Sequence, residues 1–229
     1  MKTVLKHDDA VMRLLTLYNW AGQYDKAIRI LDNRHFHLWE GGGQVHDIYV
    51  DSHALKGLKL LTGKQYAKAI QEFDLAGQYP VNLEVAPPTH GGYTAKLAYL
   101  SGLACEGQGK TAEAKAFFEQ SAQAEVRGGL SDLGYYKARA LAKLGRTDAF
   151  KAELDKLLQT RERFQKNLMD SYAKFGEADR NVQQSNMCYF SALIDLLQEN
   201  PAAAQQQLEE ALRLYPGNIW AKWMKDHAE

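Results

Sequence analysis

The chain has 229 residues, of which 45% are hydrophobic and 24% charged, a composition that suits an ordinary folded protein of one large domain or two small ones. Its 28 basic residues balance its 28 acidic residues. A neutral chain offers no basic face to nucleic acid and no polybasic patch to an anionic membrane, so we expect neither as a partner.

The apolar runs and the cysteines bear on where the protein resides. No apolar run reaches the roughly 18–20 residues that a membrane span needs. Residues 1–9 carry charge but lack the apolar core of a signal peptide. Cys105 and Cys188 are expected to pack as small apolar side chains, with a disulfide or metal pair as the minor alternative. These features predict a cytoplasmic protein, with export as the alternative if the chain is a fragment of a larger protein.

Helices are predicted in consecutive pairs along the whole chain. The first helix of each pair has apolar residues at helical spacing, as in Val11, Leu14, Leu15 and Tyr18, and these faces are expected to form the core. The first helices are predicted over residues 8–21, 50–62, 94–108, 132–144 and 185–198.

A related segment follows each first helix and repeats along the chain. Four copies align well, and they begin at or beside Gly22, Gly63, Gly109 and Asn200, whereas a copy near Gly145 is degenerate. The polar residues 159–184 are predicted to extend one second helix, turn near Gly176 and lead into the last repeat. The tail is predicted to be a capping helix in which Trp220 and Trp223 cover that repeat.

These segments resemble the tetratricopeptide repeat (TPR), in which a Gly-x-Tyr turn joins two helices and the second helix carries Ala, a large apolar residue, Ala and a closing Pro. Small residues let the paired helices approach closely, and large residues fill the gaps between them. The small residues of the first helices are Gly57, Gly102, Ala138 and Ala192. The other matches are Gly22, Tyr24, Ala27 and Leu31; Tyr66, Ala69, Phe73, Ala76 and Pro80; Gly109, Ala114 and Phe118; and Ala204, Leu208, Ala211 and Pro216.

The resemblance implies an all-α fold, a right-handed α-solenoid of about five helix-turn-helix repeats in a single domain, residues 1–229. The repeats would cover residues 8–34, 50–80, 94–124, 132–158 and 185–216, and the cap residues 218–228. Such solenoids commonly bind extended peptides or helices, so a protein or peptide partner is expected.

Two insertions, residues 34–50 and 81–93, interrupt the repeat. The leading alanines of three successive second helices, Ala27, Ala69 and Ala114, lie 42 and 45 residues apart, whereas a plain repeat has about 34 residues. Every second helix of a solenoid is followed by a turn on the same edge, so the two insertions are predicted to be neighbours.

The insertions concentrate residue types that form binding sites. These residues have three alternative roles. They form a structural contact between repeats, they contact a ligand or partner, or they contribute to catalysis. No catalytic residue is assigned, because no nucleophile triad or phosphate-binding loop is present and the sequence does not fix the separation of Glu40 and Glu84 as a carboxylate pair. The predicted ligand- or partner-binding residues are His35, His37, Trp39, Glu40, His46, Asp47, Tyr49, Asp51, His53, Glu84, His90 and Tyr93.

The pattern His35-x-His37 would form a metal site with a third ligand only if its segment is extended, so that both side chains lie on one side. The sequence does not guarantee that conformation, and no HExxH or CxxC motif accompanies it. Histidines that hydrogen-bond to loop backbone are expected instead. No metal and no cofactor is therefore predicted.

The segment Trp39-Glu40-Gly41-Gly42-Gly43 pairs an aromatic ring with a carboxylate, a combination that holds sugar rings but also binds peptides or fills cores. With the preceding His35-Phe36-His37, it is similar to the C-terminal TPR region of large bacterial proteins that carry a β-rich, carbohydrate-enzyme-like domain. The β-rich part is absent from this sequence, and the resemblance supplies no catalytic residues. It implies a carbohydrate-related context, with a carbohydrate or an adjacent β-rich domain as further partners.

The function that these features favour is a non-catalytic TPR binding or scaffold module. The alternative is that the insertions form or complete a carbohydrate-binding or carbohydrate-processing site. A self-contained metal-dependent hydrolase is a third hypothesis.

Overall fold

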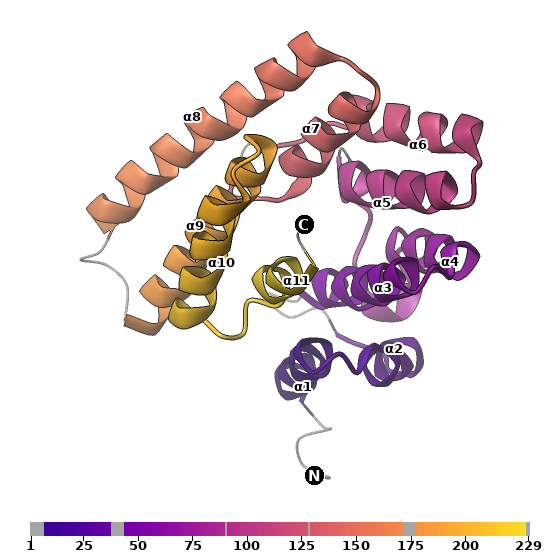
Figure 1. Cartoon of the computed structure of the whole chain (residues 1–229). Helices are drawn as coiled ribbons and strands as arrows, with labels where there is room; N and C mark the ends of the chain where they lie inside the picture. Colours follow the sequence, from indigo (N-terminus) through magenta and orange to yellow (C-terminus); the bar gives the residue numbers. More distant parts are fainter. Residues whose placement is uncertain (1–6, 38–43, 90, 128, 172–176, 228–229) are drawn as a thin grey trace. The chain divides into compact units, whose positions relative to one another are not determined.

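The computed structural model of the chain describes residues 7–37, 44–89, 91–127, 129–171 and 177–227. Within these ranges the chain forms eleven α-helices and a short 3-10 helix, and no strand (Figure 1). The prediction of an all-α fold is therefore confirmed. None of the helices in these ranges is long and apolar enough to cross a membrane.

The helices divide between two compact units, Met1–Ser121 and Ala122–Glu229, which we call the first unit and the second unit. Placement of all repeats in one domain stays a prediction. The helices in chain order are α1 (Asp8–Trp20), α2 (Tyr24–Asn33), α3 (Gln44–Thr62), α4 (Tyr66–Ala76), the 3-10 helix Val81–Leu83, α5 (Thr94–Gly107), α6 (Thr111–Gln123), α7 (Leu133–Lys143), α8 (Thr147–Ser171), α9 (Glu177–Leu197), α10 (Pro201–Leu214) and α11 (Ile219–His227).

The five helix pairs are joined by the same turn. In each turn, one backbone amide donates to the carbonyl of the residue five positions earlier in the chain. Gln23, for example, donates to Tyr18, and Asn200 donates to Asp195. This is the hydrogen bond of the Schellman motif, which requires one residue in the left-handed region. That residue is Gly22, Lys64, Gly109, Gly145 or Glu199, each with a φ between 56° and 75°. The pairs are thus structural repeats, including the degenerate copy at Gly145.

Small residues of the first helices lie against large residues of the second, as predicted. A Cβ atom added to Gly57 in α3 would lie 2.7 Å from Cδ1 of Phe73 in α4, and one added to Gly102 would lie 2.7 Å from Cδ1 of Phe118. Ala192 and Leu208 are buried in the corresponding helices α9 and α10. The close approach of the paired helices depends on these small residues.

Two predicted helix boundaries were wrong. Helix α3 includes residues 44–49, which were assigned to an insertion, because Val45 and Tyr49 extend its buried face. Helix α9 includes residues 177–184, which contain neither glycine nor proline to end it. The predicted extension of a second helix is confirmed by α8, although its predicted turn near Gly176 lies outside the described residues.

The predicted capping helix is present as α11, but its buried residues are Ala221 and Met224. Trp220 and Trp223 are half-buried, and the ring of Trp223 stacks on that of His227 with centroids 3.7 Å apart. The smaller apolar residues of α11, rather than its tryptophans, therefore face the interior of the second unit.

Candidate functional site

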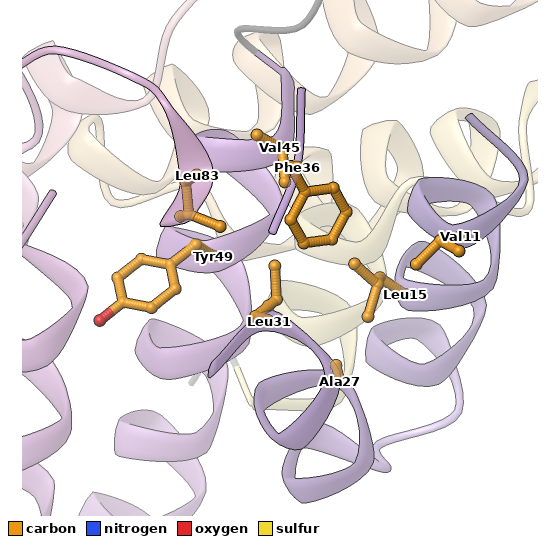
Figure 2. Packing of buried hydrophobic residues seen from close by; sticks show 8 residues of the cluster. All are labelled: Val11, Leu15, Ala27, Leu31, Phe36, Val45, Tyr49 and Leu83. Carbon is orange, nitrogen blue, oxygen red and sulfur yellow. The ribbon is translucent and has the colours of Figure 1, made fainter. Parts of the chain in front are cut away.

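The two insertions lie side by side in the first unit, which confirms the prediction that they are neighbours. The amide of Phe36 donates to the carbonyl of Asn82 at 2.8 Å. Phe36 and Leu83, one from each insertion, share a buried cluster with residues of α1, α2 and α3 (Figure 2). The insertions are thus ordered by packing on the helical core over residues 34–37 and 81–84.

Asn82 and Asp8 hold the first insertion against the end of α2 and the start of α1. The Asn82 side-chain amide donates to the carbonyls of Leu31 and Arg34, at 2.7 and 2.8 Å. Asp8 accepts from the Arg34 guanidinium at 2.6 and 2.9 Å and from the His37 amide at 3.0 Å. Burial opposes ionisation of Asp8, but these hydrogen bonds outweigh it and hold the pKa of its carboxyl below the usual value. Backbone groups that a loop would leave unpaired are thereby satisfied.

His35, His37 and Glu84 form an exposed cluster across the two insertions. His35 Nε2 lies 2.6 Å, and His37 Nδ1 3.6 Å, from the same carboxylate oxygen of Glu84, Oε1. The two imidazole rings are 4.8 Å apart at their centroids. These three predicted site residues are brought together by the fold.

His46, Asp47 and Tyr93 connect the start of α3 with the end of α4 and the second insertion. The buried His46 ring stacks on Tyr79, with centroids 3.9 Å apart and an interplanar angle of 11°, and its Nε2 pairs with the carbonyl of Gln78 at 2.9 Å. The Tyr93 hydroxyl donates to the carboxylate of Asp47. His46 is therefore a histidine bonded to backbone, as expected for structural histidines of the insertions.

Tyr49 and His53 are buried in the interior of the first unit. His53 Nδ1 pairs with Glu72 Oε2 at 2.7 Å, and Lys56 bridges Glu72 and Asp25 at 2.7 and 2.9 Å. The network links α2, α3 and α4. Because their side chains are buried, His46, Tyr49 and His53 are not available to bind a ligand or partner at the surface of the first unit.

The Glu72 network predicts that the first unit loses stability in acid. Burial would raise the pKa of Glu72, but hydrogen bonds from His53 and Lys56 outweigh it and hold the pKa below the ordinary 4.5. As the pH falls below 4.5, the unfolded chain binds this proton before the folded chain does, so the stabilisation present at higher pH is lost. We expect Glu72→Gln to flatten the decline of the unfolding free energy in acid, measured by urea titration at several pH values.

Asp74→Asn is the control for this pH dependence. Burial raises the pKa of Asp74, so its carboxyl contributes to stability with the opposite sign. The control variant should keep the full acid-induced loss. Equal pH profiles for wild type and Glu72→Gln would contradict the assignment.

The remaining predicted residues divide into two groups. Asp51 is half-buried on α3. Trp39, Glu40 and His90 lie outside the described residues, so the predicted aromatic–carboxylate pair has no structural description.

The two cysteines are both free, with Cys105 buried and Cys188 half-buried. Burial raises the pKa of each thiol, which agrees with a packing role.

The first unit also contains a cleft of about 470 Å³ that the sequence did not predict as a site. It lies among α4, α5, α6 and the second insertion. Asp74 is the only charged residue among the described residues that line it. The other side chains around it include Tyr79, Pro87, Pro88, Tyr93, Leu97 and Phe117. The proline and glycine content of residues 87–92 was a signal for this cleft, whereas Asp74 and Phe117 look like ordinary helix-surface residues in the sequence.

Asp74 lacks a partner inside the cleft. No hydrogen bond or ion pair reaches its carboxylate from another described side chain, and burial raises its pKa. Asp74 is nevertheless exposed overall, so its carboxylate keeps contact with solvent while partial burial raises its pKa. A cationic group that entered the cleft would meet this carboxylate as its counter-charge.

No protein-family model matches the sequence. Among solved structures, the chain is similar to one described as "Crystal structure of YrrB: a TPR protein with an unusual peptide-binding site", with 12% sequence identity and a TM-score of 0.33 over 99% of this chain and 97% of that chain. A TM-score this low supports no conclusion about the fold or function of the present chain. The repeat character stated above comes from its own helix pairs and turns.

Proposed function

We propose that the chain is a non-catalytic helical-repeat module of the TPR type that binds a peptide segment of a partner protein. The repeated helix pairs, their common turns and their small-to-large packing support the TPR type. The peptide is proposed to enter the cleft between α4, α5, α6 and the second insertion, with a lysine or arginine side chain directed at Asp74.

The unpaired carboxylate of Asp74 is the observation that carries this proposal. The described lining contains no lysine or arginine, so the charge of Asp74 is not neutralised within the cleft. Tyr79, Tyr93 and Phe117 surround the space with aromatic rings, which attract cations at their faces. The stem of a lysine or arginine can lie on the apolar wall while its charged end reaches the carboxylate.

The volume and lining of the cleft also fit one anchoring side chain. Ligand sites are concave and largely apolar, with few polar groups that fix orientation. Pro87 and Pro88 border the cleft, and prolines restrict the backbone of the second insertion. A wall that is already ordered loses less conformational entropy when a peptide binds.

The test uses fluorescein-labelled peptides in matched pairs, one with a central lysine or arginine and one with norleucine at that position. Wild type is expected to bind members of the basic set more tightly than their norleucine copies. Asp74→Asn should reduce that preference by up to about fivefold, since an ion pair of an exposed carboxylate contributes up to about 1 kcal/mol. Binding is measured by fluorescence anisotropy at low and high salt.

Asp32→Asn is the matched control, because Asp32 is an exposed aspartate of α2 that does not line the cleft. It should bind the peptides as wild type does. The proposal is overturned if no basic peptide binds, or if Asp74→Asn and Asp32→Asn behave alike.

The bacterial, carbohydrate-related context, an adjacent β-rich domain and the cytoplasmic location stay predictions from the sequence. The carbohydrate alternative depends chiefly on Trp39 and Glu40, which lie outside the described residues. A panel of sugars added to the same protein in a thermal-unfolding assay tests it, because a ligand that binds the folded state raises the melting temperature.

A further inference from the structure

We propose that His35, His37 and Glu84 form a binding site for a divalent transition-metal ion of the zinc class, which joins the two insertions. None of these three residues lines the peptide cleft, and the proposal does not depend on that cleft. His Nδ1 or Nε2 of both histidines and a carboxylate oxygen of Glu84 all lie within 4.8 Å of one another. Two imidazole nitrogens and a carboxylate oxygen are a ligand set that zinc accepts.

The backbone of the first insertion is extended beside the two histidines, as a His-x-His metal site requires. Arg34 is extended, with φ −111° and ψ 135°, and residues 34–37 form no helix. In extended chain, side chains two residues apart lie on the same side. The contact between the rings of His35 and His37 shows that both do so.

The third ligand is directed at the histidines by a turn in the second insertion. The 3-10 helix Val81–Leu83 ends at Glu84, whose φ is 52°. A glutamate in the left-handed region is uncommon, because its Cβ crowds the backbone there. The buried Leu83 and the hydrogen bonds of Asn82 fix the residues before it, so Glu84 is held in this conformation.

The ligand atoms need to move little to surround an ion. In a tetrahedral site, zinc lies about 2.0–2.2 Å from its nitrogen and oxygen ligands. Two ligand atoms of such a site are therefore roughly 3.3–3.5 Å from each other. His37 Nδ1 is already 3.6 Å from Glu84 Oε1, whereas His35 Nε2 is 2.6 Å from it and must withdraw by less than about 1 Å. The side chains are 52%, 67% and 36% exposed for His35, His37 and Glu84, so they have room to adjust and an ion can enter from solvent.

A bound ion would replace the hydrogen bond between His35 and Glu84 with three coordinate bonds that join the insertions. The ligands come from segments about 50 residues apart in sequence, so the ion would close a long loop of the unfolded chain. Binding only to the folded state stabilises that state. We therefore expect zinc to raise the melting temperature of the wild-type protein.

The experiment measures zinc binding to the full chain by isothermal titration calorimetry, with His35→Ala, His37→Ala and Glu84→Gln as test variants. His227→Ala is the matched control, since it removes an exposed histidine of α11 outside the cluster. Glu84→Gln keeps the length and a hydrogen bond to His35 but removes the anionic ligand. Circular dichroism establishes that every variant is folded.

Wild type and His227→Ala are expected to bind zinc in equimolar amount. Each test variant should bind at least about tenfold more weakly, since loss of even an outer-shell partner of a metal site costs 10–100-fold. Cobalt should give a visible absorption band with wild type that each test variant loses. Failure of wild type to bind zinc, or wild-type affinity in any one of the three test variants, overturns the proposal.

Discussion

Phe36→Ala is expected to lower the free energy of unfolding of the first unit by about 3–5 kcal/mol, the cost of truncating a buried aromatic side chain. The Phe36 side chain is 2% exposed and packs among Val11, Leu15, Leu31 and Leu83 (Figure 2). Its removal leaves a cavity where α1, α2, α3 and the second insertion meet. Urea unfolding followed by circular dichroism measures the change.

Val81→Ala is the control for this substitution, because Val81 belongs to the neighbouring 3-10 helix but is 89% exposed. It should alter the unfolding free energy by less than about 0.5 kcal/mol. A similar effect of both substitutions would show that Phe36 does not join the insertions to the core.

Gly57→Ala is expected to destabilise the first unit although alanine favours helices. The added Cβ would lie 2.7 Å from Cδ1 of Phe73, so α3 and α4 must separate or the ring must move. Overpacking of this kind costs about 1–3 kcal/mol, while the helix-propensity gain over glycine is about 1 kcal/mol. A net loss of up to roughly 2 kcal/mol is the expected result of the same urea titration.

Gly129→Ala is the control, because a Cβ at Gly129 would meet no atom within 4 Å. It should leave stability nearly unchanged. The double variant Gly57→Ala, Phe73→Leu should lose less stability than the sum of the two single variants, since the smaller side chain relieves the clash. Strict additivity would argue against a close contact between Gly57 and Phe73.

The helix pairs could be predicted because their signals are local. The 3.6-residue period of apolar side chains, the glycines of the turns and the small residues opposite Phe73 and Phe118 are all readable along the chain. The sequence also located both insertions through the spacing of Ala27, Ala69 and Ala114. Its errors were at the starts of α3 and α9, which begin at Gln44 and Glu177, directly after a glycine in the sequence, and not at residues 50 and 185 as predicted.

The candidate sites depended on contacts between residues far apart in sequence. In the sequence, nothing distinguishes His46, Tyr49 and His53 from His35 and His37 as candidate binding residues. In the structure, however, His46, Tyr49 and His53 belong to α3 and are buried in the interior. Asp74 gave no signal of its own, because its lack of a partner depends on what α5, α6 and the second insertion place around it. Burial and pairing of a charged group are properties of the folded chain.

The all-α class, the pairing of helices and the positions of the two insertions could all be predicted from the sequence, since they follow from periodicity and from the backbone preferences of glycine and proline. The insertion residues that contact one another could be identified only in the folded chain. Phe36 and Asn82 fix an extended segment beside a left-handed Glu84, and this contact gathers His35, His37 and Glu84 at one place. An irregular segment has no periodic pattern of its own, so its conformation is set by the long-range hydrogen bonds and apolar contacts that satisfy it.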